Sequence, residues 1–187
     1  MRSPHSNLTL AVVLGLLSAT PSFAADKFTS AAGFFSINAT TDKSSASISN
    51  PSAFSVGYLR TMTDQFEFRI NYSLLFADFS GSDLGYGLNV GFHYYPFTSA
   101  ADQRLSGNGV EATAYEIWRP YGGMIFAQRN FQSIRNSYAG IGVVGGAERY
   151  YSRDLNFYGE LSYVSLAGSS ESTATELQAV FGIVVKL

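Results

Sequence analysis

The side chains that could carry out chemistry in this chain are few, and histidine is the scarcest of them. The sequence has two histidines, His5 and His93, and only His93 lies outside the apolar leader at the N-terminus. Nucleophilic catalysis needs a base beside a nucleophile. The residues two positions from His93, on its own face of a strand, are Gly91 and Tyr95 rather than serine. We therefore interpret His93 as an interior-filling side chain and predict no catalytic residue and no enzyme.

Metal and cofactor sites are not indicated by the residue types present. There is no cysteine, and one histidine with scattered carboxylates falls short of the three or four ligands of a zinc site. The glycine-rich stretch 140–148, GIGVVGGAE, lacks the lysine and the strand–loop–helix context of a phosphate loop. The net charge is −2, without the clustered basic surface that nucleic acid requires. We predict no metal, no cofactor and no nucleic-acid partner.

Charged and polar side chains recur at alternating positions in the middle of the chain. Glu67 and Arg69 stand two residues apart and therefore share one face of a strand. They could form the gate of a narrow pore, or an ion-pair network that neutralises a buried interior, where lone charges are unfavourable. We favour the network. Its candidate members are Glu67, Arg69, Asn89, His93, Glu148 and Glu160, with Arg129 or Arg149 as further partners, although the rim of the fold is an alternative position for Arg149.

The element that must position Glu67 and Arg69 is a β-strand over residues 66–77. Apolar side chains from Phe66 to Phe76 alternate there with polar ones, which is typical of a strand with one apolar face. The same period of two predicts eight strands, at residues 28–39, 51–62, 66–77, 85–97, 119–131, 137–151, 155–166 and 175–187. In residues 119–131 it is ambiguous which face is the apolar one, because Met124 and Phe126 lie on one face and Tyr121 and Ile125 on the other. Loops are expected at 40–50, 78–83, 132–136 and 167–172.

The last predicted strand, residues 175–187, is apolar on one face up to the final residue. An unpaired apolar edge strand promotes aggregation, so this strand must pair within the fold. A sheet closed on itself, with the last strand against the first, satisfies that need. We predict an all-β fold, a closed antiparallel up-and-down barrel of eight strands. Ten strands remain an alternative, because residues 98–118 form an extended connection with weak alternation near its end.

The composition predicts that the apolar face of this barrel points outward, into a membrane. Charged residues make up 14% of the chain, whereas a surface that meets water usually carries about 25–35%. Aromatic residues lie towards the strand ends, as in the interfacial girdles of transmembrane barrels. The polar faces carry small residues and charges of both signs, which suits a narrow lumen filled by side chains. A secreted, soluble β-barrel is the alternative.

The first 24 residues have the features of a secretory signal. An apolar run over residues 8–19 is too short to span a bilayer, which needs about 20 residues. Ser22 and Ala24 supply small residues at positions −3 and −1 of a cleavage site. We predict a signal peptide over residues 1–24 and one barrel domain over residues 25–187.

The chain resembles the small eight-stranded outer-membrane β-barrels of Gram-negative bacteria, and is similar to the membrane domain of outer membrane protein A. The resemblance is carried by the signal segment, the stretch RPYGGMIF from Arg119, and the last strand. That strand resembles the family's assembly signal, although the family usually ends in an aromatic residue. Its matching residues are Phe181, Gly182, Ile183, Val185 and Leu187.

The resemblance implies a location in the outer membrane, contact with outer-membrane lipid, and assembly by periplasmic chaperones and the barrel-insertion machinery. We also expect a monomer. The loops are short for a receptor or adhesin, so we predict a structural, envelope-maintaining barrel with little or no conductance. A narrow pore for small solutes and a lipid-modifying enzyme are the alternatives. On the side of the last strand we expect an apolar lumen near the periplasmic end.

Overall fold

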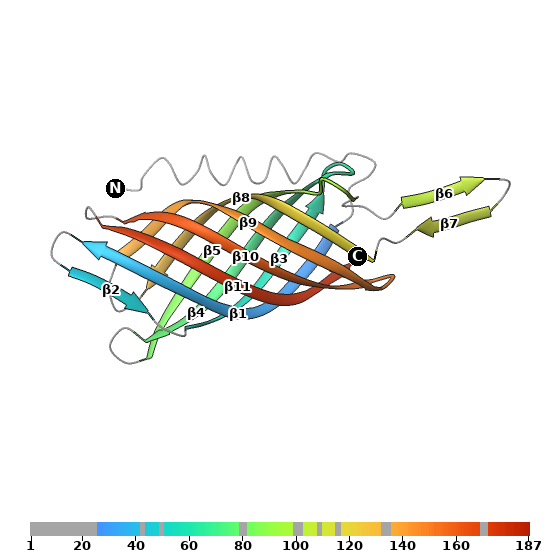
Figure 1. Ribbon diagram of the computed structural model, residues 1–187. Coiled ribbons are helices and arrows are strands. Elements are labelled where there is room, and N and C mark those ends of the chain that lie inside the picture. Colours follow the sequence, from blue (N-terminus) through green and yellow to red (C-terminus); the bar gives the residue numbers. More distant parts are fainter. Residues whose placement is uncertain are drawn as a thin grey trace, which may run out of the picture.

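The computed structural model describes residues 26–41, 44–48, 51–78, 82–98, 103–107, 110–114, 117–131, 136–168 and 172–187. One curved antiparallel sheet forms most of this part of the chain (Figure 1). The strands are β1 (Asp26–Thr41), β2 (Ser44–Ile48), β3 (Ser52–Thr61), β4 (Phe66–Asp78), β5 (Ser82–Tyr94), β6 (Gln103–Gly107), β7 (Val110–Ala114), β8 (Trp118–Phe131), β9 (Asn136–Ser152), β10 (Leu155–Gly168) and β11 (Thr173–Lys186). The signal-peptide prediction lies outside the described residues.

Eight of these strands form a closed barrel. The order β1, β3, β4, β5, β8, β9, β10, β11 runs around the sheet, and β11 pairs with β1 to close it. At this seam Gly182 lies opposite Ala31, and a Cβ on Gly182 would fall 2.3 Å from the Ser30 carbonyl oxygen. Only glycine allows the two backbones to approach so closely. The prediction of eight antiparallel strands is confirmed, and the alternative of ten is wrong because β6 and β7 pair only with each other.

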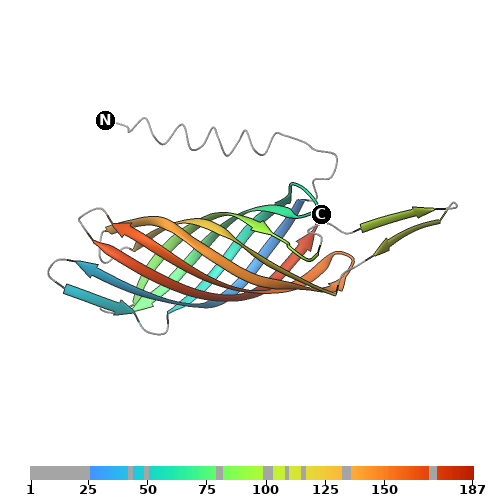
Figure 2. The same cartoon turned by 45° about the horizontal axis from the view of Figure 1, so that its top comes forward.

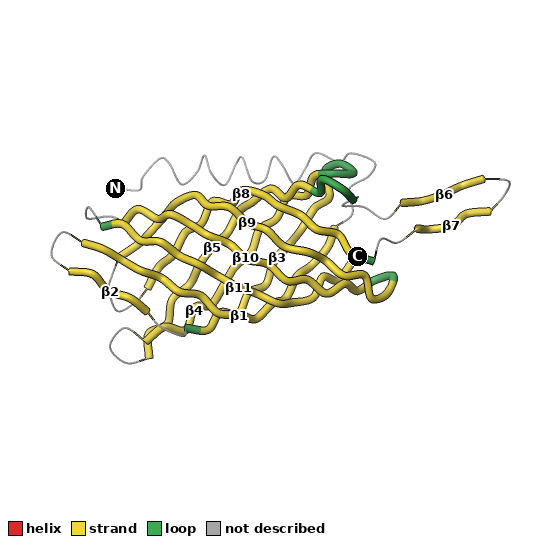
Figure 3. The backbone as a smooth tube through the Cα atoms, in the orientation of Figure 1, coloured by secondary structure: helices red, strands yellow, loops and turns green. Residues whose placement is uncertain are grey.

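The two ends of the barrel differ in the chain segments that they carry. The terminal end holds Asp26 and Leu187, and the Leu187 amide donates to the Asp26 carbonyl oxygen at 3.1 Å. The loop end, opposite, holds the connections from β1 to β3, β4 to β5, β8 to β9 and β10 to β11 (Figure 3). The β6–β7 hairpin extends beyond the terminal end, on the side of the C-terminus (Figure 2).

Three segments depart from the predicted elements. The predicted loop at 40–50 contains β2, which continues β1 as a hairpin, and the predicted connection 98–118 contains the β6–β7 hairpin. Neither has the continuous apolar face that the alternation test detects. The predicted strand 85–97 ends earlier, at Tyr94, because Pro96 has no N–H to continue the ladder. The Tyr95 amide instead donates to the Gln65 carbonyl oxygen at 2.9 Å.

The outside of the barrel is apolar, whereas the inside holds buried charged and polar side chains together with apolar ones. Met124 is 65% exposed and Phe181 is 71% exposed, whereas Glu67 and Arg129 have no exposed surface. The ambiguous strand β8 follows this rule, with Tyr121 and Ile125 inward and Met124 and Phe126 outward. A water-soluble barrel has the opposite arrangement, so that alternative is wrong. The surface is that of a transmembrane barrel. In the described part of the chain, no helix is long and apolar enough to cross a membrane.

A closed barrel of this kind is expected to stay folded in cold detergent and to migrate differently on a gel when unboiled. The reason is that closure pairs the edges of the first and last strands internally, so detergent meets no free strand edge. A chain truncated after residue 172 lacks β11 and is the matched control, because it cannot close and is expected to show one mobility. Identical mobility of boiled and unboiled full-length protein, together with its recovery in the soluble fraction, would contradict the membrane barrel.

Candidate functional site

The candidate site is a cluster of ionised side chains inside the lumen, towards the terminal end. Lys27, Glu67 and Arg119 are each the second residue of a strand that has one end there, namely β1, β4 and β8. Because alternate residues of a strand share a face, each of the three projects into the lumen. The Lys27 Nζ lies 2.7 Å from Glu67 Oε2, and Arg119 Nη2 lies 2.7 Å from Glu148 Oε2.

Arg69 is the centre of this cluster, because it approaches three carboxylates. Its Nη1 lies 2.7 Å from Glu160 Oε2, while its Nη2 lies 3.6 Å from Glu67 Oε1 and 3.9 Å from Glu148 Oε1. The guanidinium carbon also lies 5.3 Å and 5.2 Å from the ring centroids of Tyr121 and Tyr158. The aromatic faces attract this buried cation.

Two tyrosine hydroxyls join the carboxylates to the rest of the lumen. The Tyr95 hydroxyl lies 3.3 Å from Glu67 Oε1 and 3.1 Å from Glu148 Oε1, and the Tyr121 hydroxyl donates to Glu160 Oε2 at 2.9 Å. Hydrogen bonds to charged groups are among the strongest in proteins. The tyrosines therefore hold the carboxylates in place without adding charge.

A second ion pair lies in the other half of the lumen. Arg129 donates from Nε to Glu176 Oε2 at 2.7 Å and from Nη2 to Glu176 Oε1 at 2.5 Å, and its Nη1 donates to Asn89 Oδ1 at 2.8 Å. Both members of the pair are fully buried. The two-point contact matches the planar guanidinium to the planar carboxylate. The first cluster and this second pair together contain four cations and four carboxylates. The cations are Lys27, Arg69, Arg119 and Arg129, and the carboxylates are Glu67, Glu148, Glu160 and Glu176.

The structure brings together four of the six predicted network residues. Glu67, Arg69, Glu148 and Glu160 lie in one cluster. Asn89 belongs to the second pair, through Arg129.

His93 lies inside the lumen but is not one of the ion-paired residues. Its ring stacks on Tyr121 at a centroid distance of 4.7 Å and an interplanar angle of 11°. Of the two proposed arginine partners, Arg129 lies in the lumen, whereas Arg149 points outward and covers the ring of Trp118. The expectation that Arg149 crosses the lumen is wrong, and its alternative position at the rim is the one observed.

Sequence reasoning missed Lys27, Tyr95, Arg119, Tyr121 and Glu176 as network members. The alternation of residues along the last strand could have identified Glu176, because it assigns this residue to the inward face. Lys27 lies just before the predicted strand 28–39, and Arg119 belongs to the predicted strand 119–131, whose facing was ambiguous. Which of these residues meet across the lumen depends on the stagger of strands around the barrel, which no local pattern encodes.

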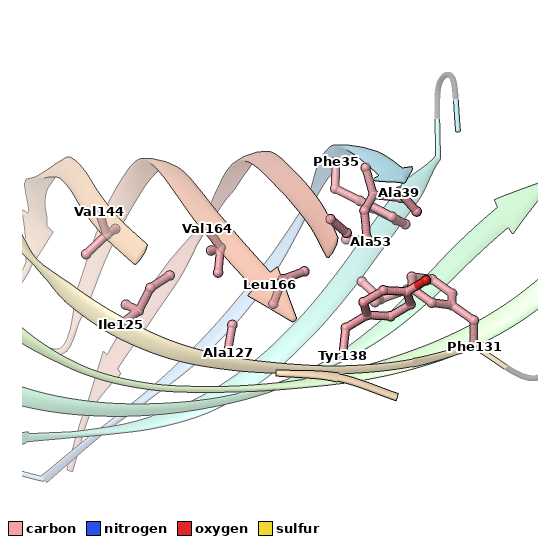
Figure 4. Packing of buried hydrophobic residues seen from close by; sticks show 13 residues of the cluster. Phe35, Ala39, Ala53, Ile125, Ala127, Phe131, Tyr138, Val144, Val164 and Leu166 are labelled. Carbon is pink, nitrogen blue, oxygen red and sulfur yellow. The ribbon is translucent and has the colours of Figure 1, made fainter. Parts of the chain in front are cut away.

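An apolar layer fills the lumen towards the loop end. Phe131 and Tyr138 lie near each other at the strand ends, with Phe35 stacked on Phe131 at a centroid distance of 6.5 Å (Figure 4). Small and branched residues close the remaining space, namely Ile37, Ala39, Ala53, Leu75, Ile125, Ala127, Val144, Val164, Leu166 and Ala174. Near the terminal end β11 contributes Val180 and Val184, as expected, but the facing wall there is charged rather than apolar.

A cavity of about 10 Å³ remains beside the cluster, which is room for roughly one water molecule. It is lined by Arg69, Asn71, Asn89, Gly91, His93, Ile125 and Glu160. Within the described part of the chain, no group of three or more histidine, cysteine, aspartate or glutamate side chains could hold a metal ion.

The residues that resemble an assembly signal lie on β11, apart from Leu187, which directly follows this strand. Phe181 and Leu187 are strongly exposed on the outer surface, Val185 is 38% exposed, and Ile183 is half-buried on the same face. Gly182 faces inward at the seam with β1. Four of these five residues therefore share the outer face of the barrel.

Comparisons with known proteins show the fold of the chain. No protein-family model matches the sequence, and no curated protein matches it. Among solved structures, the chain is similar to Neisserial surface protein A (NspA), with a TM-score of 0.52 and 16% identity over 88% of this chain and 99% of that one. Ail of Yersinia pestis, in complex with the heparin analogue sucrose octasulfate, aligns with a TM-score of 0.45 and 12% identity over 86% and 99% of the two chains. The N-terminal β-barrel domain of Pseudomonas aeruginosa OprF aligns with a TM-score of 0.41 and 14% identity over 84% and 97%. The fold is that of the small eight-stranded outer-membrane barrels.

Proposed function

We propose that this outer-membrane barrel has a structural role in the envelope of a Gram-negative bacterium and conducts little or no ion current. The observation that carries the proposal is the filled lumen. A charge-balanced cluster around Arg69 blocks the terminal half, and an apolar layer around Phe131 blocks the loop half. An ion that crossed would have to break buried ion pairs and then enter an apolar layer without water, and both steps are unfavourable.

The proposal predicts no discrete channels in planar lipid bilayers. Folded protein, verified by its gel mobility shift, would be reconstituted and recorded at about neutral pH, with a general porin as the positive control. The matched variant is Phe35→Ala/Phe131→Ala, which removes the stacked rings of the apolar layer but keeps every ion pair. Neither protein is expected to show stepwise current, because the Arg69 cluster still blocks the terminal half. Discrete steps from the wild-type barrel would contradict the structural proposal.

A narrow gated pore is the second candidate function. It is supported by the position of Arg69, which lies within 4.0 Å of three carboxylates. A change of partner along this cluster needs only a small side-chain movement, and each arrangement keeps the cation paired. Brief openings in the wild-type recordings that disappear in Arg69→Met would support this candidate over the first.

The proposal also includes the partners expected from the resemblance. The apolar belt would contact outer-membrane lipid, and β11 would be the strand that the insertion machinery recognises after periplasmic chaperones deliver the chain. Two connections at the terminal end, β3–β4 and β9–β10, are short, as is usual on the periplasmic side. On this ground the terminal end, which also carries the longer β6–β7 hairpin, would face the periplasm. The chain would act as a monomer, and no catalytic role is assigned to His93.

A further inference from the structure

The outer surface near the terminal end holds an exposed cation on an exposed aromatic ring. The Arg149 guanidinium carbon lies 5.4 Å from the ring centroid of Trp118, and the two residues are directly opposite each other in the β8–β9 register. Trp118 is 57% exposed. No carboxylate among the described residues forms an ion pair with Arg149. A surface arginine in this position has positive charge available for an anion.

The Trp118–Arg149 pair lies in a band of exposed aromatic side chains near the terminal end of the barrel. Tyr94, Tyr151 and Phe157 are exposed near the same ends of their strands. Aromatic girdles mark the level of the lipid headgroups in transmembrane barrels. Arg149 therefore lies at the depth at which phosphate groups of the lipid are found.

Directly towards the membrane from this pair, the apolar surface is hollowed. Gly122 and Gly145 face each other across β8 and β9, and both point outward. A Cβ on Gly122 would meet nothing closer than 3.7 Å, and one on Gly145 nothing closer than 4.0 Å. The flanking Leu161 is 60% exposed and Met124 is 65% exposed, so the glycines form the floor of a groove between projecting side chains.

The spacing of the two features fits one lipid molecule. Gly122 lies four positions after Trp118 on an extended strand, which corresponds to roughly 13 Å. A phosphate at Arg149 would lead its acyl chain inward over the glycine floor. The charge selects an anionic headgroup over a zwitterionic one, and an acyl chain can approach the backbone more closely at the two glycines than at a position with a projecting side chain.

We propose that the Trp118–Arg149 pair and the hollow at Gly122 and Gly145 form a binding site for one anionic phospholipid. The proposal rests on the proposed function, because it requires the barrel to lie in a bilayer. The bound lipid would be in the leaflet at the terminal end.

The test uses Trp118 itself, which is the only tryptophan in the sequence. The folded barrel is reconstituted in vesicles that contain phosphatidylcholine or phosphatidylglycerol with brominated acyl chains, and quenching of tryptophan fluorescence measures which lipid contacts Trp118. We expect phosphatidylglycerol to bind about fivefold more strongly than phosphatidylcholine, which is the effect of one arginine near a lipid surface. The preference should shrink in 1 M salt, because salt screens exposed charges.

Three variants separate the site from a general charge effect. Arg149→Gln should abolish the preference, while Arg153→Gln, which removes an exposed arginine at the adjacent turn, should keep it. Gly145→Leu fills the hollow without a clash and should reduce the preference by excluding the chain. The gel mobility shift verifies that each variant is folded.

The outcomes that overturn the proposal are distinct. Equal quenching by the two lipids in the wild type, or equal loss of preference in Arg149→Gln and Arg153→Gln, would overturn the site. An unchanged preference in Gly145→Leu would remove the acyl-chain groove from it. Absence of quenching by either lipid would contradict the bilayer location, and with it the proposed function rather than the lipid site alone.

Discussion

Replacing Arg69 with methionine is expected to lower the free energy of unfolding by about 3–5 kcal/mol, the usual effect of removing one partner from a buried ion pair. Lys27 still neutralises Glu67 and Arg119 still neutralises Glu148. Glu160 loses its ion-pair partner and keeps the Tyr121 hydroxyl. Most of the destabilisation should therefore come from the Glu160 carboxylate. Urea titration of the folded barrel in vesicles, followed by Trp118 fluorescence, measures it.

The double variant Arg69→Met/Glu160→Gln is the control for this explanation. It removes one charge of each sign and leaves three cations and three carboxylates among the ion-paired lumen residues. We expect it to recover most of the lost stability. If the double variant is as unstable as the single one, then the loss arises from packing around Tyr121 and Tyr158 rather than from the unpaired carboxylate. A loss below about 1 kcal/mol in the single variant, typical of exposed pairs, would contradict the buried network itself.

Replacing Arg129 with methionine is expected to have an effect of similar size, about 3–5 kcal/mol, for a simpler reason. Glu176 is fully buried, and its two oxygens both accept from Arg129. The variant leaves this carboxylate beside the apolar residues Ile37 and Val164, which lie opposite Glu176 on β1 and β10. The same urea titration, read by the gel mobility shift, gives the change in the free energy of unfolding.

Replacing both members of this pair should give a very different result from replacing one. Arg129→Met/Glu176→Leu puts apolar side chains of similar volume into an apolar layer. Such replacements are often neutral or stabilising by about 1–4 kcal/mol. We therefore expect the double variant to be at least as stable as the wild type. A double variant as unstable as Arg129→Met would show that the ion pair, with its bond to Asn89, is itself a net source of stability.

The alternation of apolar and polar residues was enough to predict the barrel strands, because each of these strands has one face in lipid and one in the lumen. Residues 66–77 illustrate this, since the predicted strand and β4 (Phe66–Asp78) differ by one residue. The same test failed for β2 and for the β6–β7 hairpin. Residues 40–50 are rich in serine and threonine, so no apolar face marks a strand there.

The candidate site was only partly predictable for a geometrical reason. Parity assigned Glu67 and Arg69 to one face, and the structure places both in the lumen. Their cross-lumen neighbours come from strands that are far apart in sequence, such as β9 for Glu148 and β10 for Glu160. Those contacts depend on strand tilt and stagger, which are properties of the closed barrel as a whole.

The seam between β1 and β11 has a consequence for the order of folding. It pairs Lys27 with Lys186 and Thr40 with Thr173, so its contacts join segments that are far apart in the sequence. Contacts at such large sequence separation are slow to form, because loop-closure entropy opposes them. Until β11 has been synthesised, both β1 and β10 have an unpaired edge, and such edges promote aggregation. Closure of the barrel therefore waits for β11, and a chain that lacks this strand needs protection from aggregation through its two unpaired edges.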